Sequence, residues 1–186
     1  TAVTHRKNPW LMNNFTGVQA GALMAASHAG SLHRLRQKFP YIKDWFYDTR
    51  SSGFTVASIA KTEAGQGMAL ANHIAKTNFT CKVIVVVDDD VDVTNQEEVL
   101  KAMVARWQPY GNTKLWESMP ILSLDQSTPQ LGRGSKISID ATRQLPEEGR
   151  DRPWPVMNRT LLEEGAPDAF ATVDRKFGRL IHNWRS

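Results

Sequence analysis

The sequence has little cysteine and no long hydrophobic run. Its 186 residues include one cysteine, Cys81, so no disulfide can form within the chain and no cysteine pair is available for a zinc site. No stretch reaches the roughly 18 uninterrupted apolar residues that a membrane-spanning helix needs. We therefore expect no membrane span and a reducing compartment, and we predict a cytoplasmic location.

The net charge is also small. The 23 Lys and Arg residues stand against 19 Asp and Glu residues, a formal net charge of +4. The two signs are interleaved, as in the segment RQLPEEGRDR at residues 143–152. Nucleic-acid binding needs a clustered basic face, so we expect no nucleic-acid partner.

Several well-known catalytic motifs are missing. The chain contains no G-x-S-x-G nucleophile elbow and no G-x-x-x-x-G-K-[ST] phosphate loop. None of its histidines forms an HxxxH or HExxH pair; they are His5, His28, His33, His73 and His182. These absences argue against a serine hydrolase, a P-loop nucleotidase and a histidine-based zinc site.

Patterns typical of strands and helices alternate along the chain. β-rich segments predict strands at residues 1–7, 41–48, 54–60, 82–87, 113–117 and 136–140. Apolar residues at helical spacing predict helices at residues 18–39 (one helix, or two broken near Gly30), 64–77, 94–107 and 168–184. Thr94 and Glu97 form a capping box for the third helix. This order predicts an α/β domain over residues 1–166, with a mostly parallel central sheet flanked by helices, and a terminal amphipathic helix at 167–186 for docking or oligomerisation.

Three aspartates follow the most hydrophobic of these strands. Residues Val83 to Val87 are all apolar and β-branched, as in a strand buried on both faces. Asp88, Asp89 and Asp90 come next, where two carboxylates could share a divalent cation. Such a site resembles that of nucleotide-sugar glycosyltransferases, which makes a metal-dependent glycosyl or nucleotidyl transferase one hypothesis. The alternative is that these acids only stabilise the start of the next helix.

A candidate anion site lies between the second predicted strand and the helix after it. Lys61 precedes the turn Gly65-Gln66-Gly67, which opens the helix. Backbone N–H groups, the helix dipole and an ammonium group would then converge on a phosphate. A second glycine-rich basic turn, LGRGSK at residues 131–136, is explained equally well as a tight loop.

Four segments together resemble the UbiD family of decarboxylases. They are AVTHRKNP (2–9), KFPYIKDWFY (38–47), the run from KVIVVVDDD to ARWQP (82–109) and GSKISIDAT (134–142). The resemblance implies non-oxidative, reversible decarboxylation of aromatic or α,β-unsaturated carboxylic acids with prenylated FMN, a divalent metal (Mn or Mg) and K⁺. It also implies a small carboxylic acid as substrate, the remainder of the enzyme as partner, and a homo-oligomer.

The resemblance carries few functional residues onto this chain. Lys61 matches a lysine that reaches the cofactor phosphate, and Thr16 and Gly17 match a loop on the substrate side. Asp88 to Asp90 match an acidic run that is structural in the family, so no metal ligand is expected here. The family's catalytic Glu–Arg–Glu set lies in an N-terminal part, so the catalytic residues are expected outside this chain.

We therefore predict the C-terminal domain of a UbiD-like decarboxylase, which cannot decarboxylate a substrate by itself. A non-catalytic domain that oligomerises through residues 168–184 is the second alternative.

Overall fold

Five strands and three helices make up the larger part of the structure, a computed structural model that describes residues 7, 17–48, 53–123, 125–154 and 164–177. The chain divides into two compact units, residues 1–150 and residues 151–186. Among the helices of the described residues, none combines the length and the apolar character needed to cross a membrane.

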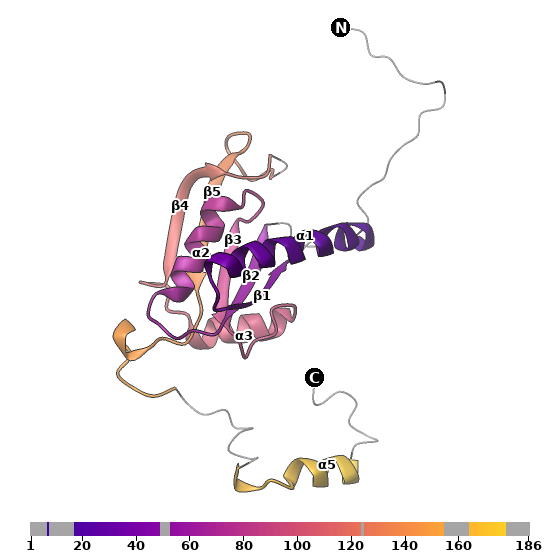
Figure 1. Ribbon diagram of the computed structural model, residues 1–186, viewed down its shortest axis with the longest axis vertical. Helices are drawn as coiled ribbons and strands as arrows, with labels where there is room; N and C mark the ends of the chain where they lie inside the picture. Colours follow the sequence, from indigo (N-terminus) through magenta and orange to yellow (C-terminus); the bar gives the residue numbers. More distant parts are fainter. Residues whose placement is uncertain (1–6, 8–16, 49–52, 124, 155–163, 178–186) are drawn as a thin grey trace. The chain divides into compact units, whose positions relative to one another are not determined.

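The strands and helices follow the predicted order (Figure 1). The strands are β1 (Ile42–Tyr47), β2 (Phe54–Ile59), β3 (Val83–Asp88), β4 (Thr113–Pro120) and β5 (Arg133–Asp140). The helices of the first unit are α1 (Gly17–Lys38), α2 (Gln66–Thr77), α3 (Gln96–Arg106) and the short 3-10 helix η1 (Pro146–Glu148). The second unit contains α5 (Ala169–Phe177).

The sheet is mixed, with the strand order β1-β2-β3-β5-β4, and not mostly parallel as the sequence suggested. Strands β2, β3 and β5 are parallel, whereas β1 and β4 pair antiparallel at the two edges. The reason lies in the connections: parallel neighbours need a crossover of a dozen or more residues, usually a helix, whereas β1–β2 and β4–β5 are joined directly by loops. Only the three central strands therefore have parallel neighbours.

Helices cover both faces of the sheet. Helices α1 and α2 lie over one face and α3 lies over the other (Figure 1). Alternate residues of β3 enter the two cores: Ile84 and Val86 pack with the α1 and α2 side, and Val85 and Val87 pack with the α3 side. All four are fully buried, which confirms the prediction of a strand buried on both faces.

Two local features of the helices became clear only from the structure. Helix α1 continues through Gly30 as one helix. Helix α3 begins one residue later than the predicted capping box, because its N-cap is Asn95, whose side chain accepts hydrogen bonds from the N–H groups of Glu97 and Glu98. The Thr94 hydroxyl instead donates to Asp92 Oδ1 at 2.7 Å.

Two predicted elements are tested only in part. The strand expected at residues 1–7 lies outside the described residues except for Lys7, which is not in a strand. The terminal helix expected at 168–184 is seen as α5, and residues 178–186 lie outside the described part of the chain. The domain boundary expected near residue 166 stays a prediction.

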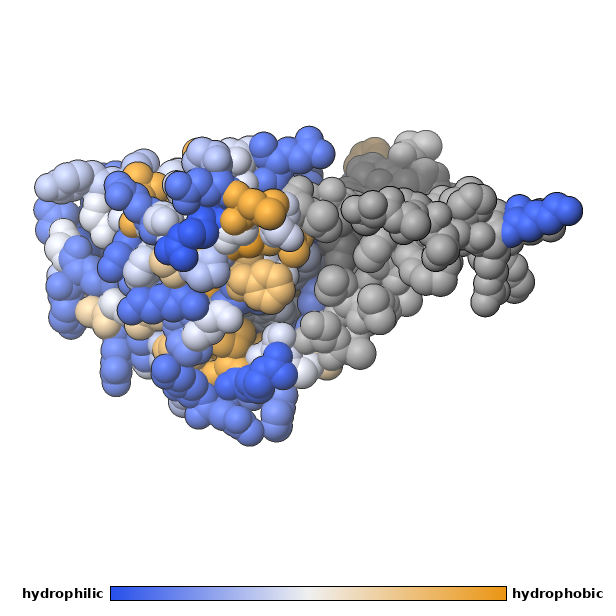
Figure 2. All heavy atoms as spheres, turned by 90° about the horizontal axis from the view of Figure 1, so that it is seen from above, coloured by the Kyte–Doolittle hydropathy of each residue, from blue (hydrophilic) through white to orange (hydrophobic). Residues whose placement is uncertain are grey.

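The described side chains on one face of the molecule are mainly polar. On the face seen in Figure 2, hydrophilic side chains dominate and the hydrophobic ones gather near the middle of the view. Some large apolar side chains are nonetheless exposed, among them Val104 on α3 and Phe79 in the loop after α2.

Candidate functional site

Polar residues gather where the three parallel strands end. Lys61 follows β2, Asp88 ends β3, and Asp140 ends β5. The carboxyl ends of parallel strands lie at the same edge of a sheet, which is where α/β proteins bind their ligands. This edge is the candidate functional site, and it contains two groups of interacting side chains.

The first group surrounds the Lys61 ammonium. The Lys61 side chain is only 3% exposed, and its Nζ donates hydrogen bonds to Thr142 Oγ1 at 3.0 Å and to Glu148 Oε2 at 2.5 Å. Asp140 Oδ1 accepts from the Thr142 hydroxyl at 2.6 Å and from the Thr142 N–H at 3.0 Å. We call Lys61, Gly65, Asp140, Thr142 and Glu148 the Lys61 cluster.

The Glu148 carboxylate is held by donors from three parts of the chain. Besides the Lys61 ammonium, it accepts from the Gly65 N–H at 2.8 Å and from the Leu145 N–H at 2.8 Å. Burial raises the pKa of Glu148, but these three hydrogen bonds outweigh it, so the pKa lies below its ordinary value. Within the Lys61 cluster, the Lys61 ammonium and the Gly65 N–H are thus donors matched to anionic oxygens.

Two glycines shape the start of α2. Gly65 has φ of 78°, the left-handed conformation that favours glycine, and no side chain caps the helix from this position. A Cβ on Gly67 would lie 2.4 Å from both carboxylate oxygens of Asp140, so the buried acid packs directly against the helix backbone. Both features bring the first turn of α2 close to the strand ends.

The structure brings together residues that the sequence analysis treated separately. Lys61 and the Gly65 N–H, predicted to share an anion, both contact one carboxylate, that of Glu148. Glu148 was not predicted as a site residue, because it lies between the last predicted strand, which ends at residue 140, and the predicted terminal helix, which begins at residue 168. That this site binds a cofactor stays a prediction.

The second group links the aspartates after β3 to two arginines. Arg106 Nη1 donates to Asp88 Oδ2 and Asp90 Oδ1, each at 2.8 Å, and its Nη2 donates to Asp90 Oδ2 at 2.8 Å. The Arg143 N–H donates to Asp88 Oδ2 at 2.8 Å, and the Arg143 guanidinium pairs with Asp90. These contacts use the carboxylate oxygens that a cation would need.

The arginine contacts therefore do not support the metal-site hypothesis for Asp88–Asp90. Burial raises the pKa of Asp88 above its ordinary value, opposed by the Arg143 N–H and by Arg106. The pKa of Asp90 is also raised by burial, but its two arginine partners outweigh that effect and lower it. Across the described residues, no group of three His, Cys, Asp or Glu side chains could hold a metal ion.

The GSK and DAT segments have different tasks. Lys136 is 3% exposed, and its ammonium donates to the carbonyl oxygens of Ala75 and Asn78 at 2.8 and 2.7 Å, at the C-terminal end of α2. A Cβ on Gly134 would lie 2.8 Å from Thr128 Cγ2, so this position is tightly packed. The first segment thus supports the fold, whereas Asp140 and Thr142 of the second belong to the Lys61 cluster.

The predicted substrate-side residues are tested least. Thr16 lies outside the described residues, and Gly17 is the first residue of α1. The assignment of both residues to a substrate cleft stays a prediction.

Solved structures with a similar fold include UbiD-class enzymes and aromatic acid decarboxylases. Vanillic acid decarboxylase from Sedimentibacter hydroxybenzoicus, in a closed form, is 25% identical with a TM-score of 0.62, covering 74% of this chain and 30% of that one. The UbiD-class enzyme HmfF from Pelotomaculum thermopropionicum, in complex with FMN, is 25% identical with a TM-score of 0.60 over 75% of this chain and 32% of that one. An evolved dimeric HmfF in complex with prFMN shares the fold at 23% identity and a TM-score of 0.56, covering 74% and 28%.

The chain thus spans about a third of the length of these enzymes. A family model described as the 3-octaprenyl-4-hydroxybenzoate carboxy-lyase C-terminal domain matches residues 21–141, which include every strand of the sheet, α2, α3 and most of α1. On this evidence the chain belongs to the UbiD carboxy-lyase family, as its C-terminal domain.

Proposed function

We propose that this chain is the C-terminal domain of an enzyme that decarboxylates aromatic or α,β-unsaturated carboxylic acids, reversibly and without net oxidation, using prenylated FMN. The observation that carries the proposal is the family match over residues 21–141. The similar structures support it, because one is named a vanillic acid decarboxylase and others hold FMN or prFMN. Prenylated FMN, when bound, supplies an electron sink for the loss of CO₂.

Within this domain, we propose that Lys61 and the Gly65 N–H hold the phosphate of the flavin. An ammonium group and the N–H groups at a helix start are the donors that phosphate oxygens prefer. Lys61 and Gly65 present such donors, and both already hold an anionic oxygen of Glu148. The donor set therefore fits a phosphate in its chemistry, and Glu148 would have to share these donors or yield them.

The other groups of the full enzyme are assigned outside this chain. We propose that the acid–base residues, and the ligands of the divalent metal (Mn or Mg) and of K⁺, come from the remainder of the enzyme. Asp88 and Asp90 pair with arginines, so we assign these carboxylates a structural role. They hold the residues after β5 against the end of β3.

The activity is tested with the protein in which this chain occurs, loaded with prenylated FMN and offered a panel of hydroxybenzoic and cinnamic acids. We expect substrate loss with stoichiometric CO₂ release, and none when unmodified FMN replaces the prenylated form. We expect no turnover from the 186 residues alone. Failure of the flavin-loaded protein to release CO₂ from any acid of the panel would contradict the proposed reaction.

The phosphate assignment is tested by flavin retention. Lys61→Ala removes the ammonium, so we expect the purified protein to keep at least tenfold less flavin than the wild type. Lys82→Ala is the matched control, because Lys82 pairs with Asp125 at 2.8 Å near the opposite end of β3 and should leave flavin retention unchanged. Equal flavin content in Lys61→Ala and wild type would rule out the assignment.

A further inference from the structure

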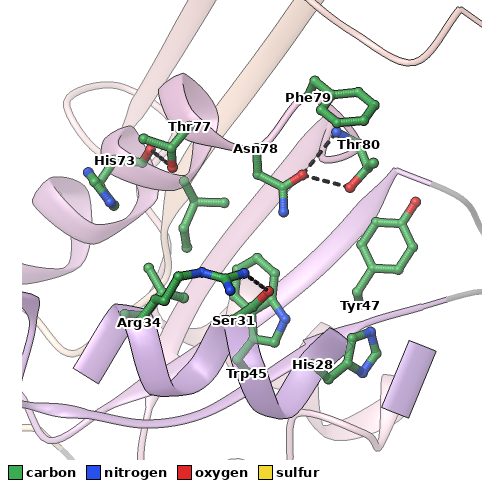
Figure 3. A pocket seen from close by; sticks show the side chains of 12 residues that line it. His28, Ser31, Arg34, Trp45, Tyr47, His73, Thr77, Asn78, Phe79 and Thr80 are labelled. Carbon is green, nitrogen blue, oxygen red and sulfur yellow. Dashed lines mark hydrogen bonds between the residues drawn. The ribbon is translucent and has the colours of Figure 1, made fainter. Parts of the chain in front are cut away.

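A pocket of about 550 Å³ lies between α1, β1 and the C-terminal end of α2 (Figure 3). Its volume is within the range of roughly 300–1,000 Å³ that small-molecule sites occupy. Helix α2 has 12 residues and begins at the Lys61 cluster, so the pocket lies at the other end of a helix roughly 18 Å long. The pocket is therefore separate from the site described above.

A buried donor without a partner lies in this pocket. Trp45 is 6% exposed, and its indole Nε1 is buried without a hydrogen-bond partner in the structure. His28 Nε2, on the α1 side of the pocket, is also buried without a partner. An indole N–H can only donate, and leaving such a group unpaired is unfavourable, so the pocket favours an occupant with an acceptor atom.

A second donor comes from the loop after α2. Asn78 Oδ1 accepts from the Thr80 N–H at 2.9 Å and from the Thr80 hydroxyl at 2.7 Å. Because a backbone N–H can only donate, this contact identifies the accepting atom as the oxygen, and the Asn78 NH₂ group is the one directed into the pocket (Figure 3). Its two hydrogens add to the demand for an acceptor.

The described residues that line the pocket carry charge of one sign. Among these twelve, Arg34 is the one with a formal charge, and none is acidic. Its guanidinium donates to Ser31 Oγ at 3.1 Å, which uses one of its five N–H groups. Lys38 Nζ lies 3.3 Å from Nδ1 of His73, another lining residue, so the surroundings are positive as well.

The remaining wall is apolar. Leu35 and Ile74 are buried core residues that line the pocket, and Phe79 lines it while 56% exposed. The site thus combines converging donors, a positive charge and apolar side chains. Water would satisfy the donors but would gain nothing from the apolar wall.

We propose that this pocket binds a small carboxylate with an apolar body, its carboxylate oxygens accepting from Arg34, Asn78 and the Trp45 indole while the body lies against Leu35, Ile74 and Phe79. This site goes beyond the proposed function and does not depend on it, because none of its residues belongs to the Lys61 cluster.

The test is an NMR titration of the ¹⁵N-labelled 186-residue chain. The six tryptophans yield six indole N–H signals, and Trp45→Phe identifies the one from Trp45. We expect benzoate to shift this signal saturably, whereas acetate, which lacks the apolar body, and benzyl alcohol, which lacks the charge, bind at least tenfold more weakly.

Two variants examine the donors separately. Arg34→Gln removes the charge at an exposed position, and Asn78→Asp keeps the acceptor for Thr80 while replacing the NH₂ group with a charged oxygen; each should weaken benzoate binding at least tenfold. Lys101→Gln is the matched control, because it also removes one positive charge, on α3 over the other face of the sheet, and should bind like the wild type.

The proposal would be overturned by an unshifted Trp45 signal at millimolar benzoate, by equal affinity for benzyl alcohol, or by full affinity in both Arg34→Gln and Asn78→Asp. A Trp45 signal that moves with protein concentration, and not with benzoate, would assign the pocket to self-association and would also refute it. The NMR titration does not measure decarboxylase activity, so it can fail while the proposed function stands.

Discussion

Two buried lysines, Lys61 and Lys136, show how the partner decides what a charged residue does. Lys136 donates to backbone carbonyls at the end of α2, where a positive charge complements the negative end of the helix dipole. Lys61 donates to a carboxylate at the start of the same helix. Lys136 therefore stabilises the fold, whereas Lys61 provides chemistry suited to an anionic ligand.

The Glu148 carboxylate should make stability depend on pH. Its pKa in the folded chain lies below its ordinary value of 4.5, so the stabilisation is present above that value and is lost as pH falls through the folded pKa. We expect the free energy of unfolding to decrease below about pH 4.5, and to decrease less steeply in Glu148→Gln. Chemical denaturation at a series of pH values from 7 to 3 measures this, and identical slopes for both proteins would contradict it.

Gly67 and Gly30 should respond to alanine in opposite directions. At Gly67 the new Cβ would lie 2.4 Å from the Asp140 carboxylate, so we expect Gly67→Ala to destabilise the fold by about 1–3 kcal/mol. At Gly30 the nearest atom is 3.7 Å away, inside α1, so Gly30→Ala should stabilise by about 0.5–1 kcal/mol. Urea denaturation measures both, and a neutral Gly67→Ala would show that Asp140 can move away freely.

At the scale of elements, the start of α3 depends on a single side chain. Asn95 accepts from two N–H groups of the first turn, and its Nδ2 donates to Glu98 Oε1 at 3.2 Å. We expect Asn95→Ala to lower the free energy of unfolding by about 1 kcal/mol, the usual loss for an N-cap. Thr94→Ala is the control and should cost less. It removes the hydroxyl that donates to Asp92 Oδ1 but keeps the Thr94 N–H that donates to the same oxygen. Equal losses of stability in the two variants would favour the capping box that the sequence suggested.

The elements themselves were predictable where the local signal was strong. The apolar, β-branched run of β3 and the helical spacing of α2 identify both elements correctly, because burial on two faces or on one stripe leaves a direct trace in the sequence. Strand direction leaves no such trace. The antiparallel edges follow from which strands become neighbours, and the sequence pattern of β1 or β4 does not contain that information.

At the scale of the whole molecule, the terminal helix is the element for which we predict a role in assembly. In the sequence, the apolar residues Phe170, Phe177 and Trp184 recur every seven positions, and Phe177, the last residue of α5, is 48% exposed. We predict that this helix mediates self-association, so a chain ending at Pro167 should sediment as a smaller species than the full chain. The same oligomeric state in the full chain and in the chain ending at Pro167 would contradict this prediction.

The sequence by itself determined the α/β class, the order of the described elements and the family, because each rests on local periodicity or on ordered motifs. Only the tertiary structure showed that Asp88 and Asp90 bind arginines, that Glu148 occupies the donors of Lys61 and Gly65, and that the edges of the sheet are antiparallel. The physical reason is distance along the chain. Lys61 and Glu148 are 87 residues apart, and a hydrogen bond between them exists only once the strands have placed both at the same edge of the sheet.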